Sequence, residues 1–367
     1  MTLHSLFCRR HRRFVKQQAP AQSTSLSHMA WRRFCRNRLS VASLVVIGLF
    51  LLTAILGYLI TPDHTPHCNQ QYLELATLRP GSKATFLCID PVDNPGGSFL
   101  TGHPLPYTAI PIDSCHMTAD SIHAYPVAGE PFTIGRSRLA RLHTRTFWLG
   151  TDAYGRDVLS MIMIGSRVSL SVGFIAVLIA LLIGITLGAL AAYHGGWVDN
   201  LITWLINVVW SIPTVLLVIA ITFALGKGFW QVFVAVGLTM WVDIARVVRG
   251  QVYSIKEKEY VEAARALGLG TFRTIFCHIL PNITGAVIVV AASNFASAIL
   301  LEAGLSFLGI GVQPPMPSWG TLVKENYPYI LLDSAYLPLL PGAAIMLLVL
   351  AFMLLGNGIR DALDIKS

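Results

Sequence analysis

The sequence predicts an all-α polytopic membrane protein with six transmembrane helices and a small β-rich extracytoplasmic insert. Of its 367 residues, 54% are hydrophobic and only 13% are charged, which is too few charges for a water-soluble surface around so large an apolar content. The apolar residues form windows of about 20, the length that crosses a hydrocarbon layer of about 30 Å. One stretch between the first two windows instead has the Pro and Gly turns and the alternating pattern typical of short strands.

Six apolar windows fit transmembrane helices. The first three carry no charged side chain, whereas the fourth carries Asp243 and Arg246 in its last part. We expect these two residues to pair at i, i+3 near the interface, which would lower the cost of both charges. An even number of spans places both termini on one side of the membrane. The windows are 39–60, 168–193, 201–225, 229–248, 283–301 and 336–355.

Basic residues set the expected orientation. Lys and Arg cluster before the first window and again between the fourth and fifth, which places both regions in the cytoplasm. Four Arg between 136 and 145 would lie outside, but long segments translocate largely regardless of charge. The expected organisation is a cytoplasmic basic segment with an interfacial turn near Trp31, the first transmembrane helix, the extracytoplasmic insert, and a core with five further spans: 1–38, 39–61, 62–146 and 147–367.

The net charge of +8 does not indicate nucleic-acid binding. Basic segments next to a membrane span have a commoner explanation in topology and in attraction to anionic lipid. The first window could be taken for a secretory signal, but nearly forty residues precede it and no small-residue cleavage site follows. We interpret it as a retained anchor.

Cysteine and histidine residues are frequent in the insert. An oxidising compartment would permit one disulfide among Cys68, Cys88 and Cys115, with the third thiol left over and the pair undetermined. Six His lie between 64 and 143, and a metal site built from them with Cys68 or Cys115 is conceivable. Their spacing fits no compact ligand pattern, so scattered surface histidines are the favoured interpretation and no metal is expected.

The loop 249–282 contains two short amphipathic patterns. Apolar residues recur at i, i+3, i+4 and i+7 in both, which predicts two helices. We expect Gly268-Leu269-Gly270 to form the turn between them, Thr271 to cap the second helix and Pro281 to end it. An interfacial linker fits the same periodicity, and a DNA-binding helix-turn-helix is disfavoured because two spans tether the loop. The predicted apolar faces are Tyr260, Ala263, Ala264, Leu267 and Phe272, Ile275, Phe276, Ile279.

This loop resembles the EAA loop of ATP-binding cassette (ABC) importer permeases. The match rests on Glu262-Ala263-Ala264, Gly268 and Leu280-Pro281, with His278 where an aliphatic residue is usual. Further motifs resemble the C-type permease subunit of the dipeptide, oligopeptide and nickel importers, with Asn357 where Asp is more usual. They read GTDAYGRDV from Gly150, GGWVDN from Gly195, LSFLG from Leu305, PSWG from Pro317 and GNGIRDALD from Gly356.

The resemblance implies a type I ABC importer permease fold over the first helix and about 147–364, whereas the insert matches no known pattern. It implies an ATPase-coupling role for Glu262, Ala263, Ala264, Arg265, Gly268, Leu280 and Pro281. It also implies as partners two ATPase subunits that use ATP and Mg, a second homologous permease, an extracytoplasmic solute-binding protein and membrane lipid. No phosphate-binding loop of the GxxxxGK[ST] type occurs, so this chain is expected to be no enzyme and to bind no cofactor.

The expected function is a permease for dipeptides or oligopeptides in a bacterial inner membrane, with nickel or another small solute as the alternative. An ion-coupled carrier, an ABC exporter and an intramembrane protease are weaker alternatives, since most spans lack ionisable or catalytic groups. Pro213 and Glu302 are the candidates for lining a path, although packing for Pro213 and an outer interface for Glu302 are favoured. The GxxxG pair Gly184 and Gly188 is expected to pack helices closely.

Overall fold

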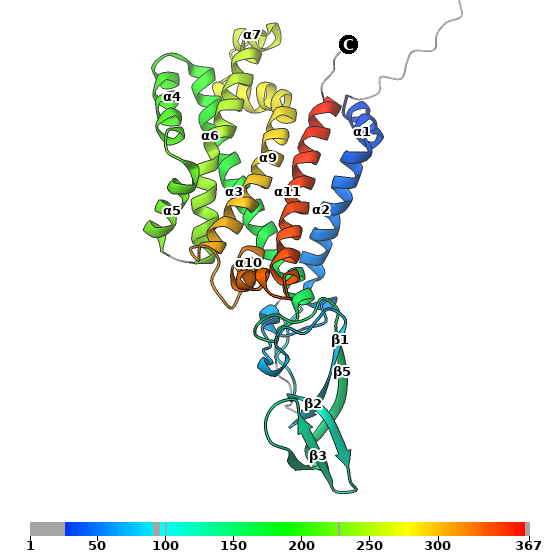
Figure 1. Ribbon diagram of the computed structural model, residues 1–367. Coiled ribbons are helices and arrows are strands. Elements are labelled where there is room, and N and C mark those ends of the chain that lie inside the picture. Colours follow the sequence, from blue (N-terminus) through cyan, green and yellow to red (C-terminus); the bar gives the residue numbers. More distant parts are fainter. Residues whose placement is uncertain (1–25, 91–95, 100, 227, 364–367) are drawn as a thin grey trace, which may run out of the picture.

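The computed structural model of the chain describes residues 26–363 apart from 91–95, 100 and 227. Long helices dominate it and run roughly side by side (Figure 1). They are α1 (Leu26–Arg36), α2 (Arg38–Leu56), α3 (Val158–His194), α4 (Gly196–Trp210), α5 (Thr214–Leu225), α6 (Phe229–Lys256), α7 (Glu259–Ala266), α8 (Thr271–Thr274), α9 (Leu280–Phe307), α10 (Trp319–Asn326) and α11 (Tyr336–Leu363).

The predicted membrane class is confirmed. In the described part of the chain, five helices are long and apolar enough to cross a membrane, or six if the bent pair α4 and α5 counts as one span. The second window was drawn too short, because α3 begins ten residues earlier and includes Arg167. The third window is a bent pair of helices rather than one straight helix. The chain bends by 92° between α4 and α5, where Pro213 lacks the N–H that would continue the helix.

The two ends of the helical bundle differ. A five-stranded sheet projects beyond one end, which we call the sheet end, while α1, α7 and the last turn of α11 lie at the opposite, hairpin end (Figure 1). The interfacial turn expected near Trp31 is the helix α1, and residues 1–25 of the predicted basic segment lie outside the described residues. The described basic segment α1 and the loop 249–282 therefore lie at the same end of the bundle, opposite the sheet.

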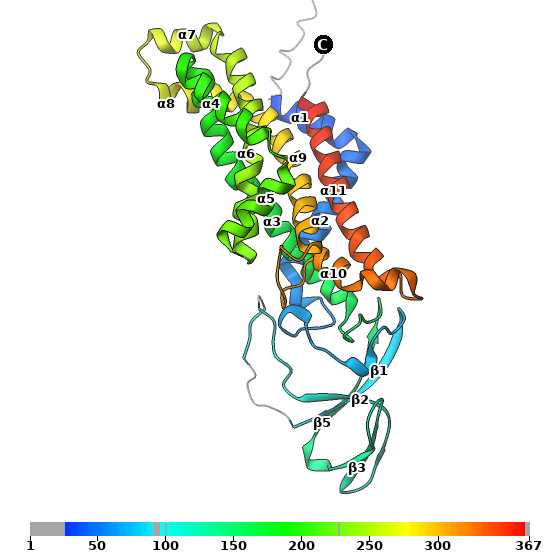
Figure 2. The same cartoon turned by 60° about the vertical axis from the view of Figure 1, so that its left-hand side comes forward.

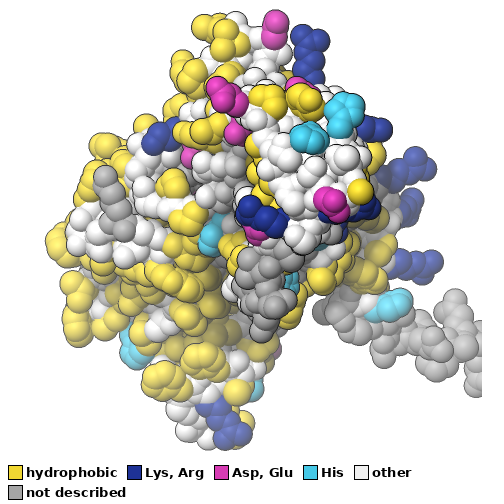
Figure 3. Space-filling model, turned by 90° about the horizontal axis from the view of Figure 1, so that it is seen from below, with side chains coloured by type: hydrophobic (Ala, Val, Ile, Leu, Met, Phe, Trp, Pro, Cys, Tyr) yellow, Lys and Arg dark blue, Asp and Glu magenta, His cyan; other side chains and the backbone are white. Residues whose placement is uncertain are grey.

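The predicted β-rich insert is confirmed as an antiparallel sheet. Its strand order is β4-β3-β2-β1-β5, and a register shift interrupts both the β1–β5 and the β2–β3 pairing. Seen from the sheet end, charged and His side chains are scattered over this part, and hydrophobic side chains cover the flank of the helical bundle beside it (Figure 3). The strands are β1 (Ser82–Ile89), β2 (Thr108–Met117), β3 (Ser121–Pro126), β4 (Phe132–Gly135) and β5 (Leu139–Phe147).

Two glycines of the GTDAYGRDV motif allow the sheet to meet the bundle. Gly150 and Gly155 have positive φ angles of 78° and 72°, and a Cβ on either would lie within 2.2 Å of a backbone oxygen. Between them, Asp152 accepts hydrogen bonds from the Arg156 backbone N–H and from its guanidinium. Arg156 also pairs with Glu325 in α10. The motif thus joins the sheet to the start of α3.

Arg145 of β5 forms a second link at the same junction. Its guanidinium lies 3.4 Å from the carboxylate of Asp157, which caps α3, and 4.0 Å from that of Asp63, at the start of the insert. Both carboxylates are buried, with exposed side-chain fractions of 1% and 2%. One cation therefore compensates two buried anions, and the three residues come from three separate segments of the chain.

Helices α3 and α6 form the centre of the bundle. The predicted close packing at Gly184 and Gly188 is confirmed, because a Cβ on Gly188 would lie 2.5 Å from the Ala245 carbonyl oxygen and one on Gly184 would lie 2.7 Å from Cβ of Ile244. The main hydrophobic core lies along this contact. Small residues thus replace the hydrophobic effect that would hold such helices together in water.

The insert cysteines are free thiols, so the disulfide that an oxidising compartment would permit is not formed in this structure. Cys68 and Cys88 are buried, and burial raises the pKa of both thiols, which keeps them protonated. Within the described residues, no group of three or more His, Cys, Asp or Glu side chains is arranged to hold a metal ion.

Candidate functional site

The loop 249–282 forms a helical hairpin at the end of the bundle opposite the sheet (Figure 2). Its first arm is α7, whose two acidic residues in the first turn suit the positive end of the helix dipole. The Gly268 N–H donates to the Arg265 carbonyl and the Leu269 N–H to the Ala264 carbonyl, which is a Schellman cap. Gly268 has a φ of 77°, so the predicted role of this residue in the turn is confirmed.

The second arm begins differently from the prediction. The N-cap of α8 is Gly270, and Thr271 is already the first helical residue. After one turn, the backbone widens into the π-helical turn η5 (Ile275–Ile279), in which the Leu280 N–H donates to the carbonyl of Ile275. The Asn282 side chain donates to the carbonyl of His278 at 2.7 Å.

Pro281 does not end this arm, contrary to the prediction. The helix runs without a break from Thr271 to Phe307 as a single span candidate. Proline has no N–H and its ring would collide with the carbonyl four residues earlier, but the wider π-turn removes this collision. The hairpin is consequently continuous with α9, which is a more direct connection than the predicted helix end would give.

The buried face of the hairpin also differs from the predicted one. Val261, Ile275 and Ile279 pack into the main hydrophobic core, and Ala264 is buried as well. The other predicted members are exposed: Ala263, and four large side chains with exposed fractions of 45%, 81%, 74% and 61%, which are Tyr260, Leu267, Phe272 and Phe276 respectively. The rings of the two Phe residues stack at 6.4 Å. Periodicity found the helices but not which face is covered.

The residues expected to couple to an ATPase lie together on this hairpin. Five of them are exposed, Ala264 is buried and Leu280 is partly buried against the core. The Arg265 guanidinium lies 4.7 Å above the ring of Tyr193, so it holds α7 against the end of α3 as well as facing outward. The exposed five are Glu262, Ala263, Arg265, Gly268 and Pro281.

A polar cluster below the hairpin was missed in the sequence. Asp199 accepts hydrogen bonds from Arg249 at 2.5 and 2.7 Å and from the Tyr253 hydroxyl at 3.2 Å. Lys256 donates to the carbonyl of Ala192 in the last turn of α3. These contacts fix α4 and α3 to the end of α6, from which the hairpin emerges. The GGWVDN motif contains Asp199, and this motif was the signal available in the sequence.

The two path-lining candidates have different outcomes. Glu302 does not line a path, because it is fully buried near the sheet end of α9 and accepts hydrogen bonds from Ser306 at 2.7 Å and from Ser169 at 3.2 Å. The hydroxyl groups replace the water that an exposed carboxyl would need, so the path-lining prediction for this residue is wrong. Pro213 is exposed at the break before α5 and remains a candidate.

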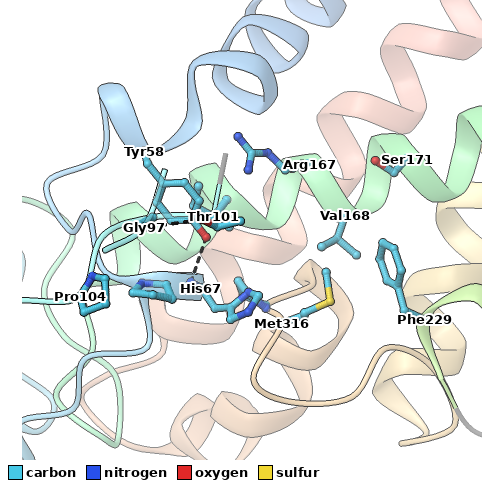
Figure 4. A pocket seen from close by; sticks show the side chains of 14 residues that line it. Tyr58, His67, Gly97, Thr101, Pro104, Arg167, Val168, Ser171, Phe229 and Met316 are labelled. Atoms are coloured by element: carbon cyan, nitrogen blue, oxygen red, sulfur yellow. Dashed lines mark hydrogen bonds between the residues drawn. The ribbon is translucent and has the colours of Figure 1, made fainter. Parts of the chain in front are cut away.

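A cavity of about 430 Å³ lies at the sheet end, between the insert and the bundle (Figure 4). Arg167 of α3 lines it, donates to the Ala54 carbonyl at 2.9 Å and lies 5.3 Å above the Tyr58 ring. The Tyr58 hydroxyl accepts from the backbone N–H of His67 at 2.9 Å. Sequence analysis did not identify Arg167 as a cavity residue, because the predicted second span starts one residue after it.

Comparison with known proteins gives two family matches. Residues 184–366 match the binding-protein-dependent transport system inner membrane component, and residues 25–80 match the N-terminal transmembrane domain of oligopeptide transport permease C. The dipeptide transport system permease protein DppC of Alkalihalophilus pseudofirmus is 43% identical over 219 residues, which cover 60% of this chain and 72% of that protein. This chain belongs to that permease family. It is therefore a transport component and a multi-pass membrane protein.

Other relatives of the permease agree. The glutathione transport system permease protein GsiD of Pectobacterium atrosepticum is 42% identical over 60% of this chain and 72% of its own length. The oligopeptide transport system permease protein OppC of Bacillus subtilis is 37% identical over 61% and 73%. Among solved structures, an inward-facing form of the MetNI methionine ABC transporter aligns at 18% identity with a TM-score of 0.47, over 55% of the permease and 96% of that chain.

The family models leave residues 81–183 of the permease unmatched. This range contains all five strands and the first part of α3. The hairpin, in contrast, lies wholly within the matched region. The hairpin thus lies in the region that this chain shares with the family, while the sheet lies outside both models.

Proposed function

We propose that this chain is the transmembrane subunit of an ABC importer for dipeptides and oligopeptides and forms the translocation path together with a second, homologous permease. Two separate ATPase subunits bind ATP and Mg²⁺, and an extracytoplasmic binding protein delivers the solute at the sheet end. The peptide substrate is supported by relatives named for dipeptides, oligopeptides and glutathione. In this proposal the membrane is the bacterial cytoplasmic membrane, and the hairpin and both termini face the cytoplasm.

The hairpin is the observation that carries the coupling proposal. It presents Tyr260, Leu267, Phe272 and Phe276 to the outside, although its other face is packed into the core. Clustered exposed apolar side chains beside charged ones mark a surface for a protein partner. Because the second arm continues into α9, and because α7 is held to α3 and α6, a push on this surface is transmitted to three core helices as one body.

The test is a charge reversal at Glu262, the exposed acidic residue of the coupling motif. We expect Glu262→Lys to leave membrane insertion intact, to abolish ATP-driven peptide uptake in proteoliposomes and to reduce the amount of ATPase that copurifies. Glu130→Lys is the matched control, since Glu130 is an exposed glutamate at the sheet end, far from the hairpin. It should leave uptake and copurification unchanged.

Three results would contradict the proposal. Normal uptake by the Glu262→Lys variant would show that the hairpin is not the coupling surface. Uptake by the purified chain without ATPase subunits would show that it is not a subunit of an ABC importer. Peptide uptake by ATP-depleted vesicles under an ion gradient would instead support a secondary transporter.

A further inference from the structure

One acidic side chain in the membrane-spanning helices has no role in the packing described above. Asp243 lies at the fifteenth position of the 28-residue helix α6, the most enclosed of the span candidates. Its neighbours along the helix are buried, but Asp243 itself is exposed. The expected ion pair with Arg246 is not formed, because Arg246 instead lies 4.1 Å above the ring of Trp210. Within the described residues, Asp243 has no hydrogen-bond or ion-pair partner.

Asp243 lines a cavity of about 550 Å³ between three helices, at the break between α4 and α5. Thr214 and Val215 contribute the first turn of α5, and Ser297 and Leu301 contribute α9. At 1.5 Å per residue, Asp243 is about 21 Å from the sheet end of α6, and Thr214 is about 16 Å from that of α5. The cavity therefore lies within a hydrocarbon layer of about 30 Å.

The walls of this cavity are held in place independently of Asp243. The Asn294 side chain of α9 donates to the carbonyl of Met240, which lines the cavity one turn before Asp243. Gly184 and Gly188 of α3 press on the opposite side of α6, against Ile244 and Ala245. The carboxylate is thus presented on a fixed helix rather than on a mobile segment.

A carboxylate at this depth is too costly to face lipid, at about 2.5–3.5 kcal/mol or more for a charge at a helix centre. A position next to a broken helix is where irregular backbone in membranes borders an aqueous cavity. In the proposed function, the path runs between two permeases. The exposed face of α6, which no other described helix of this chain covers, then lines this path. The carboxylate then meets solute rather than lipid.

We propose that Asp243 binds the cationic group of the solute, the protonated amine of a peptide, as it passes the middle of the membrane. The inference rests on the proposed function and adds a specificity-determining residue to it. An ammonium group supplies the opposite charge and the hydrogen-bond donors that the unpaired carboxylate lacks. The cavity volume is within the range of sites for small solutes, about 300–1,000 Å³.

The experiment measures the uptake of radiolabelled dialanine by the complete importer in proteoliposomes. The affinity of the isolated binding protein for dialanine is measured separately. We expect Asp243→Asn to lower the uptake rate about tenfold, the ratio for losing one hydrogen bond to a charged group. Asp243→Glu should retain most of the uptake. The control is Asp361→Asn, because Asp361 is an exposed acidic residue in the last turn of α11 and outside the cavity.

Restoring the charge separates binding from a structural role. In a background with all native cysteines replaced by serine, Asp243→Cys is modified with a negatively charged sulfonatoethyl or a positively charged trimethylammonium methanethiosulfonate. The anionic reagent should restore uptake and the cationic one should block it. Equal effects of the two reagents, or unchanged uptake by Asp243→Asn, would overturn the inference.

Two further outcomes are distinguishable. If Asp243→Asn dissociates the second permease while the remaining intact complexes transport normally, Asp243 is an ion-pair partner of that subunit and the inference is wrong. If the unmodified importer shows no ATP-driven dialanine uptake, the proposed function is wrong. The water-filled cavity is then tested separately, by the rate at which each reagent modifies the thiol introduced by Asp243→Cys. If neither reagent modifies this thiol, the inference of a water-filled cavity is overturned as well.

Discussion

Arg145 shows how much of the architecture depends on one side chain. It lies between Asp63 and Asp157, both buried, and its own side chain is only 16% exposed. Asp63 accepts a hydrogen bond from Thr65 and Asp157 one from Ser160, but in the described residues each carboxylate also has an oxygen without a hydrogen bond. The arrangement joins the start of the insert, its last strand and the beginning of α3.

Replacing Arg145 by Met should leave two buried carboxylates without a cation. Removing one partner of a buried ion pair costs about 3–5 kcal/mol, so the free energy of unfolding should fall by that order. Thermal unfolding in detergent measures it. Arg138→Met is the control, because the Arg138–Asp90 pair is exposed and should contribute little.

The same variant has a predictable pH dependence. Burial raises the pKa of the Asp157 carboxyl above its ordinary value, against the lowering effects of Ser160 and Arg145. The folded protein therefore takes up this proton more readily than the unfolded chain, and the cost of the ionised form declines as the pH falls through the folded-state pKa. The destabilisation by Arg145→Met should accordingly be smaller at about pH 5 than at about pH 7.5. An equal loss at both values would contradict this assignment.

At the scale of elements, the closely packed pair α3 and α6 forms the centre of the bundle. Helix α6 is the most buried span candidate, and glycines on both helices remove the space a side chain would need. Gly237 repeats the contact in the reverse sense, since a Cβ there would lie 2.8 Å from Cβ of Ile179. Helices α2, α4, α5 and α9 pack on one or both members of this pair, and α11 packs on α9 and α2.

Gly188→Ala should separate the two helices. Its Cβ would lie 2.5 Å from the Ala245 carbonyl oxygen, and overpacking of this kind costs about 1–3 kcal/mol. Gly48→Ala in α2 is the matched control, because no atom lies within 4 Å of a Cβ there and alanine is the better helix former. The midpoint of thermal unfolding should fall for the first variant and stay level or rise for the second.

At the scale of the whole molecule, the sheet and the hairpin lie at opposite ends of the bundle (Figure 1). In the proposed function, this arrangement lets a solute arrive at one end while the ATPase subunits act at the other. It also gives the orientation of the chain a direct test, because Cys277 is an exposed native thiol on the hairpin.

A membrane-impermeant maleimide should label Cys277 in inside-out vesicles but not in right-side-out vesicles. Cys277→Ser should remove the part of the signal due to this residue, while the exposed Cys35 of α1 is still labelled. A reporter placed in the sheet by Met117→Cys, at a position 47% exposed, should show the reverse pattern. Labelling of Cys277 from outside would invert the topology and remove the basis of the coupling proposal.

The sequence by itself determined the elements whose signal is local. Runs of apolar residues predicted the spans, alternation and turns predicted the sheet, and a 3.6-residue period with Gly268 predicted the hairpin. The EAA pattern also indicated the family. Helix boundaries were less accurate. A charged residue such as Arg167 ends an apolar window in the sequence, but it does not end the helix α3.

Only the tertiary structure decided which side each residue faces and what it meets there. Glu302 is buried and accepts hydrogen bonds from Ser169 and Ser306, whereas Asp243 is exposed and its expected partner Arg246 lies over the ring of Trp210 instead. The π-turn before Pro281 likewise depends on how the hairpin meets α9. The physical reason is that burial and pairing are set by groups far apart in the chain, while periodicity records only neighbours.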